Sequence, residues 1–580
     1  MEMSNYKKPL SIHQPYLSSF ERHQEYSPLQ VIINMKLHSF TLIATLAIFN
    51  VVNSLPVDEQ AILNLNNPAS KDGIIPYVNE YGHDHKGEED NDEQIDIMSE
   101  VEYNQLPLVE TEALQALINE PGLKSRAHSL FDIAQRSVKK YGHPTRVIGS
   151  KGHWGTIDYI KSEIYRLRGY YTVKTQAFSA IDGKVNSYSL LIDGIKPKSL
   201  EALSLTPPTP NGKPVHGNLV LIDGFGCSLS DYPANLTAGN IALVKRGECA
   251  FGDKSINAGK SGAVGAIIFD NLPLHGTLGT PTGDEVPTVS ITEKDALDYI
   301  KKLTEDPSYK FETTLYVDSV ITNITTLNVI AETRFGDHDN VVSLGAHSDS
   351  VTEGPGINDD GSGTISLLEV AKELTKFKVK NAVRFAWWAA EEEGLLGSDY
   401  YANSLNEEEN SKVRLFMDYD MMASPNYEYE VYDANNEDHP NGSGTLKDLY
   451  IDWYTSHGLN YTLVPFDGRS DYVGFIDNGI PAGGIATGAE GVKTKEGEEK
   501  FGGKAGDWFD PCYHQLCDDL SNPDYEAWVI NTKLIAHSVA TYAESFDGFP
   551  IREKSTTIST NEQSPKKVNN FKYHGSRLII

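Results

Sequence analysis

Five residues between positions 347 and 514 have side chains of the types that bind zinc: His347, Asp359, Glu392, Asp420 and His514. Imidazole nitrogens and carboxylate oxygens are ligands that this borderline-soft ion accepts. A carboxylate shared by two metal ions can hold them about 3.5–4 Å apart, the spacing used by two-metal hydrolases. Glu391 adjoins one of the five and is the obvious proton carrier beside them. The set therefore predicts two Zn²⁺ per chain and the hydrolysis of peptide bonds.

Three apolar runs rich in β-branched residues end at or close to these residues: VVSLGA (341–346), NAVRFAWWAA (381–390) and VRLFMDYDMM (413–422). They predict buried strands, and residues 363–377 have apolar side chains at helical spacing. Strands that alternate with helices predict an α/β fold with a doubly wound, mostly parallel central sheet flanked by helices. Ligands bind outside the carboxyl ends of the strands of such a sheet, which is where the five residues fall.

Each residue has a simpler interpretation when it is taken alone. A single histidine such as His347 or His514 is more often a hydrogen-bonded structural residue than a ligand. Asp420 could cap a turn, and Glu391 to Glu393 could be a solvated run of charge. The segment GPGINDDGSG (354–363) suits a turn, and it lacks the Lys-Ser/Thr ending of a phosphate-binding loop. The coincidence of all five residues with the ends of predicted strands favours the metal site.

The segments that hold these residues resemble those of a known family and occur in its order. They are GAHSDS (345–350), GPGINDDGSG (354–363), WWAAEEEGLLGS (387–398), DYDMMASPN (418–426) and CYHQLCDD (512–519). The family is the zinc exopeptidase family of co-catalytic aminopeptidases, in particular the secreted and vacuolar aminopeptidase Y type with an inserted protease-associated domain. The resemblance covers about residues 110–546. It implies a zinc-dependent aminopeptidase that acts on peptides with a free N-terminus.

The resemblance also implies a role for each residue of the set. The expected outer ligands are His347 and Asp420 for one zinc ion and Glu392 and His514 for the other. Asp359 is expected to bridge the two ions, and its peptide bond to Asp360 is expected to be cis. Zinc lowers the pKa of a bound water towards neutrality. Glu391 is expected to accept that proton and to return it to the leaving amine, as a general acid/base does.

Two further residues are expected to support the reaction. Asp349 follows His347 by two positions, so its carboxylate could accept the free imidazole N–H and fix the tautomer. The alternative is an ordinary aspartate that caps a loop. Tyr513 adjoins His514, and the matching tyrosine of the family helps to hold the oxyanion of the tetrahedral intermediate. A tyrosine that only packs there is the alternative.

The arginine content bears on which end of the substrate is bound. A C-terminal carboxylate needs arginine, and only Arg414 and Arg469 lie between Glu391 and His514. We therefore favour an aminopeptidase over a carboxypeptidase, with large apolar N-terminal residues as substrates. Arg469 resembles a position whose backbone carbonyl contacts the substrate amine, although it could simply pair with Asp467 or Asp471. Candidates for the pocket wall are Met421, Phe475 and Ile485.

Composition excludes some partners. The formal net charge is −31 and the sequence pI is near 4.9, which argues against binding to nucleic acid. Apart from the signal-like segment at 35–55, no segment is apolar enough to span a membrane, and no stable span is expected. Ten Asp or Glu residues lie between Glu80 and Glu102, opposed only by Lys86. That run is typical of a disordered or removable pro-segment.

The chain divides into segments of different character. We expect an N-terminal extension and signal segment (1–55, with the signal at 35–55), an acidic pro-segment (56–110), the first part of the peptidase domain (111–184), a β-rich protease-associated insert (185–315), the catalytic part of the peptidase domain (316–546) and a polar, basic tail (547–580). The signal begins at Met35, so translation starts there or the segment acts as a signal-anchor. Short β-runs broken by Gly and Pro, such as NIALVKRGECAF, mark the insert, which is expected to act as a lid or gate.

The cysteines and sequons point to an oxidising lumen. Four cysteines allow three pairings, of which we favour Cys227–Cys249 and Cys512–Cys517. Zinc binding by the second pair is the alternative, which the spacing disfavours. Glycosylation sequons occur at Asn235, Asn323, Asn441 and Asn460. Together with the signal, these features predict a secreted protein or a vacuolar one.

Two rival functions use the same scaffold. One is a non-catalytic receptor ectodomain, which is expected to have lost metal ligands. The other is an acyl-transferring cyclase that uses one zinc ion. The complete ligand set disfavours both, and the number of metal ions bound per chain would separate the three.

Overall fold

The computed structural model describes residues 97–552, apart from 234–236 and 272–275. The predicted signal, most of the acidic segment, most of the basic tail and Asn235 lie outside these residues. Within the described ranges, none of the helices has both the length and the apolar character needed to cross a membrane.

Four parallel strands form the centre of the peptidase sheet, in the order β13 (Ala482–Ala486), β10 (Val413–Tyr419), β8 (Asp337–His347) and β9 (Asn381–Trp388). Beyond β13 lie β11 (Glu430–Tyr432), antiparallel to it, and then β12 (Thr462–Val464), parallel to β11. Strands β8, β9 and β10 are those expected from the three apolar runs. The predicted α/β fold with a mostly parallel central sheet is confirmed.

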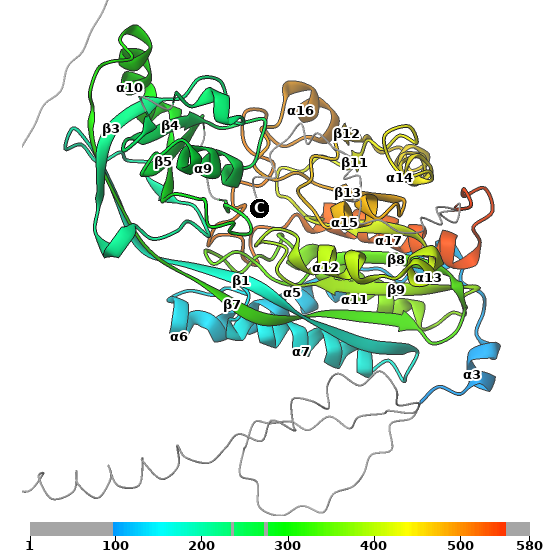
Figure 1. Cartoon of the computed structure of the whole chain (residues 1–580). Coiled ribbons are helices and arrows are strands. Elements are labelled where there is room, and N and C mark those ends of the chain that lie inside the picture. The colour runs from blue at the N-terminus through cyan, green and yellow to red at the C-terminus, as the bar shows by residue number, and fades with distance from the viewer. Residues whose placement is uncertain (1–96, 234–236, 272–275, 553–580) are drawn as a thin grey trace, which may run out of the picture. The chain divides into compact units, whose positions relative to one another are not determined.

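Two long antiparallel strands carry the sheet from the peptidase into the insert. They are β1 (Tyr171–Ile192) and β7 (Glu312–Thr333), shown in Figure 1. The C-terminal end of β7 pairs with β9, whereas its N-terminal end pairs with β3 (Val215–Leu221). The boundaries expected at 184/185 and 315/316 therefore fall inside continuous strands.

Within the insert the sheet continues from β3. The strands of the insert are β3, β4 (Ile241–Lys245), β5 (Gly265–Asp270) and β6 (Thr288–Thr292), all parallel, followed by the short antiparallel β2 (Glu201–Ala202). Its helices are α9 (Phe251–Lys260) and α10 (Glu293–Glu305). Buried aliphatic side chains from these strands, such as Leu243 and Ile267, form a separate core.

Helices cover both faces of the peptidase sheet. The larger core lies under α4 (Thr111–Gln115), α5 (Glu120–Ala134), α7 (Lys151–Tyr165), α11 (Gly361–Leu374), α14 (Ser443–Ser456) and α17 (Tyr525–Glu544). The smaller core lies under α12 (Leu396–Ser404) and α15 (Tyr472–Asp477). Because successive strand residues face opposite ways, Trp387 belongs to the first core and Trp388 to the second. The remaining helices are α3 (Glu100–Gln105), α6 (Val138–Tyr141), α13 (Glu407–Lys412) and α16 (Lys495–Phe501).

Both predicted disulfides, Cys227–Cys249 and Cys512–Cys517, are present in the structure. The first joins the segment after β3 to the segment after β4, and the second closes the loop that carries His514.

Three of the four sequon asparagines can be placed. Asn323, Asn441 and Asn460 are exposed, and the Asn460 side-chain amide donates a hydrogen bond to the Lys500 carbonyl at 2.8 Å. Glycosylation at these positions stays a prediction.

Candidate metal centre

The ends of three adjacent strands bring the predicted ligands to one edge of the sheet. His347 is the last residue of β8, Glu392 follows β9 and Asp420 follows β10. Asp359 lies in the loop that leads into α11, and His514 lies in the disulfide-closed loop. All five side chains point into one buried cluster, although they come from distant parts of the chain.

The cluster consists of two groups that share Asp359: His347, Asp359 and Asp420 in one, and Asp359, Glu392 and His514 in the other. The Nε2 atom of His347 lies 3.1 Å from Asp359 Oδ1, and that of His514 lies 3.1 Å from Asp359 Oδ2. Asp420 Oδ1 is 3.6 Å from His347 Nε2, and Glu392 Oε2 is 3.1 Å from His514 Nε2. This is the arrangement expected for a bridging carboxylate with a histidine on each side.

The unsatisfied oxygens of the cluster fit bound cations. Both carboxylate oxygens of Glu392 and the Oδ1 atom of Asp420 are buried without a hydrogen-bond donor among the described residues. Buried carboxylates normally find donors, because an unpaired buried charge is unfavourable by several kcal/mol or more. Two imidazoles and three carboxylates are also the ligand types that zinc prefers. The residues present therefore suit a divalent metal site.

Electrostatics support the same conclusion. Burial raises the pKa of Glu392 to about 7 and that of Glu391 well above its usual range. Burial would lower the pKa of His514, but the Glu392 and Asp359 carboxylates raise it to about 10. Protons on the histidines and carboxylates thus compensate the negative charge when metal is absent, and metal ions would replace those protons.

Glu391 and Asp349 lie beside the cluster. Glu391 Oε2 is 3.8 Å from His347 Nε2, and its side chain is almost completely buried. Asp349 Oδ1 is 3.8 Å from His347 Nδ1, which is too long for a hydrogen bond. The Asp349 carboxylate instead accepts hydrogen bonds from the backbone amides of Glu391 and Glu392, at 3.3 and 3.4 Å. It therefore positions the segment that carries Glu391.

Two aspartates hold the backbone around Asp359: Asp360, which our sequence reasoning named only for its expected cis peptide bond, and Asp518, which it did not name. Asp360 accepts hydrogen bonds from the amides of His347, Gly363 and Met421, and its peptide bond to Asp359 is cis, as expected. Asp518 accepts from the amides of Asn358 and Asp359 at 2.9 and 3.0 Å. Asp360 lies in the segment NDDG and Asp518 in the segment LCDD, each close in sequence to a predicted ligand. That proximity is the signal that could have identified them.

Arg146 is a third residue that the sequence did not reveal. It is fully buried, and its guanidinium donates to the carbonyls of Pro355 at 2.9 Å and Gly356 at 2.6 Å, and to that of Ser348. It thereby ties the segment after His347 to the loop that carries Asp359. It lies about 200 residues upstream of both, and no motif marks it.

A cavity of about 210 Å³ opens beside the ligands. Met421 and Arg469, the residues expected to bind the substrate, line it together with Tyr513. The expectation for Phe475 and Ile485 was wrong. Phe475 stacks on the Phe416 ring with a centroid distance of 3.6 Å, and Ile485 lies within β13; both are fully buried. Ile485 faces the larger core from β13, and Phe475 faces the smaller core from helix α15 (Tyr472–Asp477).

Arg469 and Tyr513 contact each other in the cavity wall. Arg469 Nη2 donates to Glu490 Oε2 at 2.8 Å and to the Tyr513 hydroxyl oxygen at 3.4 Å. Asp467 lies 3.8 Å from Arg469 Nη1. The Tyr513 ring stacks on His514 with 3.8 Å between centroids. Arg469 is thus a paired arginine, as the alternative interpretation held, and Glu490 is its nearest partner.

Comparisons with known proteins agree with this site. The family model "Peptidase family M28" matches residues 328–539, and the PA domain model matches residues 215–299. Aminopeptidase Y of Saccharomyces cerevisiae is 53% identical over 498 residues, which cover 83% of this chain and 89% of that protein. Leucine aminopeptidase 2 of Trichophyton rubrum is 42% identical over 470 residues, covering 79% and 91% respectively. An aminopeptidase from Aneurinibacillus sp. strain AM-1 has a similar structure, with a TM-score of 0.61 and 25% identity over 78% of this chain and 99% of that one.

The fold and the paired ligand groups define the class of the protein. It is a metallo-exopeptidase whose candidate metal centre lies at the ends of adjacent strands of the central sheet. The chain belongs to peptidase family M28. It is a metallo-aminopeptidase with a PA domain inserted into the peptidase, and the family, the fold and the reaction class predicted from the sequence are confirmed.

Metal-free protein should gain thermal stability on addition of zinc. A ligand that binds only the folded state stabilises it by about 4 kcal/mol at a thousandfold excess over its dissociation constant. We expect a clear rise in the unfolding midpoint for the wild type, measured by scanning calorimetry after chelation and dialysis. Asp359→Ala protein should show little of this rise, whereas Asp519→Ala, a change at a nearby aspartate outside the ligand set, should keep it. An equal response in all three proteins would contradict the site.

Proposed function

We propose that the chain releases N-terminal residues from peptides with two zinc ions bound, one in each of the ligand groups that share Asp359. The observation that carries this proposal is the position of Asp359 between the two histidines, at 3.1 Å from each. When bound, the metal ions would polarise the scissile carbonyl and activate a water molecule. A receptor or a one-zinc cyclase would not require the complete double set.

The protein's own groups would then guide the proton and the charge. Glu391 takes the proton from the attacking water and delivers it to the leaving amine, because it lies beside His347 at the ligand cluster and is shielded from solvent. Tyr513 donates a hydrogen bond to the oxyanion as it forms. The backbone carbonyl of Arg469 and nearby carboxylates receive the α-ammonium group of the substrate.

The arginines of the site support binding of the N-terminus. Arg469 lines the cavity, but Glu490 and Asp467 already pair with it. Arg414 instead donates to Asn340 and to the carbonyl of Pro550, and its guanidinium lies over the Phe546 ring. Neither guanidinium offers the unpaired fork that a substrate carboxylate needs.

Replacement of Glu391 by glutamine should abolish most of the activity and leave the metal in place. General acid/base groups contribute about 10²–10⁴-fold to the rate, so kcat for leucine p-nitroanilide should fall by at least that lower figure. Zinc content, measured by atomic emission, should stay at two per chain. A variant that keeps nearly full activity would exclude Glu391 as the base, and one zinc per chain in the wild type would exclude the two-metal proposal.

The cavity wall suggests two classes of N-terminal residue. Tyr432, Val464 and Phe509 provide apolar surface, which suits leucine or phenylalanine. Glu430 also lines the cavity, and burial raises its pKa to about 8. A lysine ammonium would pair with this carboxylate and favour its ionised form. Peptides with an N-terminal lysine are therefore a second candidate class of substrate.

A Glu430→Gln variant should separate the two candidates. If lysine pairs with Glu430, kcat/KM for lysine p-nitroanilide should fall about tenfold, the size of one charge-assisted hydrogen bond, while the value for leucine p-nitroanilide changes little. A Glu428→Gln variant serves as the control, because Glu428 accepts a hydrogen bond from Thr462 and does not line the cavity. Equal changes for both substrates would leave apolar residues as the preferred class.

The rest of the peptide needs a second path away from the metal centre. A cavity of about 330 Å³ reaches the same Glu392 and His514 and continues between β1, the insert and residues 351–353. Glu393 lines it, and its Oε2 atom has no hydrogen-bond partner among the described residues. This carboxylate could accept a backbone N–H of the substrate beyond the scissile bond. We assign the residues that follow the scissile bond to this cavity.

Filling this cavity should hinder peptides more than small anilides. Ala202 of β2 lines it, and Ala202→Trp should lower kcat/KM for a leucine-initiated tetrapeptide about tenfold, as lost or blocked contacts of about 1.4 kcal/mol do. The value for leucine p-nitroanilide should stay within about twofold. Leu297→Trp, an exposed position on α10, should change neither substrate. A tetrapeptide rate unaffected by Ala202→Trp would place the leaving peptide elsewhere.

The compartment follows from the cysteines and the predicted signal. All four cysteines form disulfides, which persist in secretory and vacuolar lumens and rarely in the cytosol. We propose that the protein matures in the secretory pathway. Recovery of activity from the medium or the vacuole fraction of expressing cells would test this.

A further inference from the structure

One side chain of the insert, Arg246, forms an ion pair with a residue next to the wall of the active-site cavity. It is the only arginine between residues 169 and 333, and it directly follows β4. Its Nη1 atom donates to Asp270 Oδ2 at 2.7 Å, within the insert. Its Nη2 atom donates to Glu490 Oε1 at 3.3 Å, in the peptidase. Arg246 therefore joins the two parts of the chain next to the cavity wall.

Glu490 links two guanidinium groups. Its Oε1 atom accepts from Arg246 and its Oε2 atom accepts from Arg469 at 2.8 Å. Side-chain exposures are 14% for Glu490 and 16% for Arg246, so solvent screens these charges only weakly. Burial alone would raise the pKa of Glu490, but the two guanidiniums lower it. The carboxylate is therefore ionised and held from both sides.

Arg469 extends this chain of contacts to Tyr513. The Nη2 atom that pairs with Glu490 also lies 3.4 Å from the Tyr513 hydroxyl oxygen. Because Arg469 donates to that oxygen, the tyrosine directs its own O–H away from Arg469. This contact restricts the directions in which the hydroxyl can donate, and a pre-oriented donor is what stabilisation of an oxyanion requires.

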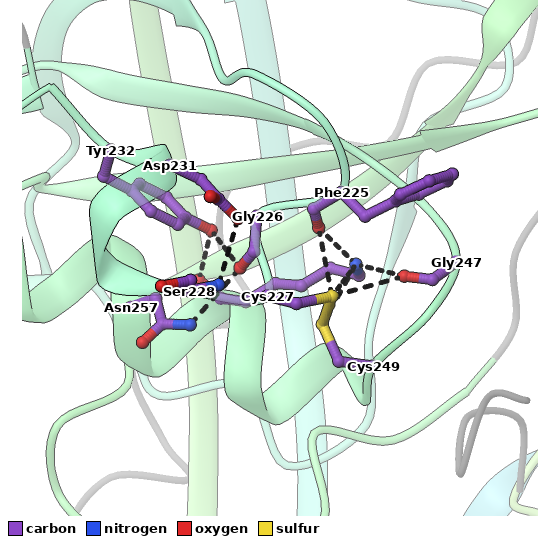
Figure 2. Close-up of a disulfide and its surroundings, with 10 residues drawn as sticks. Phe225, Gly226, Cys227, Ser228, Asp231, Tyr232, Gly247, Cys249 and Asn257 are labelled. Carbon is purple, nitrogen blue, oxygen red and sulfur yellow. Dashed lines mark hydrogen bonds between the residues drawn. A yellow bond between two sulfur atoms is a disulfide. The ribbon is translucent and has the colours of Figure 1, made fainter. Parts of the chain in front are cut away.

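A disulfide and a buried lysine hold the segment that follows Arg246; Figure 2 shows the disulfide and the residues around it. The disulfide between Cys227 and Cys249 fixes it to the segment after β3. Lys254 of α9 is fully buried, and its Nζ atom donates to the carbonyls of Gly247 at 2.7 Å and Phe225 at 2.5 Å. Lys254 thus holds Gly247, which directly follows Arg246, and Phe225, which lies two residues before Cys227.

We propose that Arg246 is a positioning residue for peptide hydrolysis, which acts through Glu490 and Arg469 to orient the Tyr513 hydroxyl. The insert then contributes to the chemical step and not only to the shape of the cleft. This inference rests on the proposed role of Tyr513. It requires no contact between Arg246 and the substrate.

The test compares kcat and KM for leucine p-nitroanilide in the holoenzyme with Arg246→Met, Arg246→Lys, Tyr513→Phe and the double variant. Loss of an oxyanion donor lowers kcat about 10²–10³-fold, so loss of its orientation should lower kcat by less, about tenfold, with KM almost unchanged. Arg246→Lys should restore part of the loss, because an ammonium can still pair with Glu490. Lys260→Met is the matched control, since Lys260 pairs with Asp284 on the exposed surface of the insert at 3.3 Å.

The double variant distinguishes positioning from a general loss of structure. In the Tyr513→Phe background, Arg246→Met should have almost no further effect on kcat, because the group that it orients is absent. Independent, multiplicative losses, or an Arg246→Met enzyme with normal kcat, would overturn the inference. If Tyr513→Phe itself keeps normal kcat, the proposed role of Tyr513 fails. Thermal midpoints within a few degrees of the wild type would show that each variant is folded.

Discussion

Negative charge concentrated in a buried volume is the constraint on which the rest of this structure depends. The carboxylates of Asp349, Asp360, Glu391, Glu393, Asp418, Asp471, Asp510 and Asp518 surround the metal ligands, and nearly all are buried. Burial makes ionised carboxylates unfavourable unless donors or cations compensate them. Backbone amides compensate Asp360 and Asp518, and Arg146 supplies a buried positive charge. The remaining negative charge is stabilised by bound cations. Metal binding and the stability of the native site are therefore coupled.

The sheet explains how this charge can be collected without long flexible loops. Three parallel strands end side by side, and each delivers a ligand or the residue next to one within a few positions of its last hydrogen bond. The ligands then need support only from the loop before α11 and from the loop around His514. Asp360, Asp518 and Arg146 fix those loops by accepting or donating backbone hydrogen bonds, and they have no direct place in the ligand set.

The sequence was sufficient for the features that depend on local pattern. Apolar runs that end at His347, Glu391 and Asp420 predicted both the strands and the edge at which the ligands meet. Pairings between distant residues were not predictable in the same way. Arg146 contacts carbonyls about 200 positions away, and Arg246 contacts a carboxylate about 240 positions away. Neither the periodicity of the sequence nor the spacing of its motifs indicates such contacts. Phe475 and Ile485 were misplaced because an apolar residue near a site can face either the cavity or a core. Strand register decides this for Ile485 of β13, and the packed face of helix α15 decides it for Phe475.

The long pairing of β1 with β7 has a mechanical consequence. These strands pair from Tyr171 opposite Thr333 to Ile192 opposite Thr313, with one irregularity near Val185. A domain joined by a flexible linker can swing as a rigid body, whereas one joined by a continuous ribbon can move only as far as the ribbon twists or bends. Large opening of the insert would break backbone hydrogen bonds along that ribbon. Selectivity for substrates should therefore come from the fixed dimensions of the entrance to the active site. Opening and closing of the insert should contribute little.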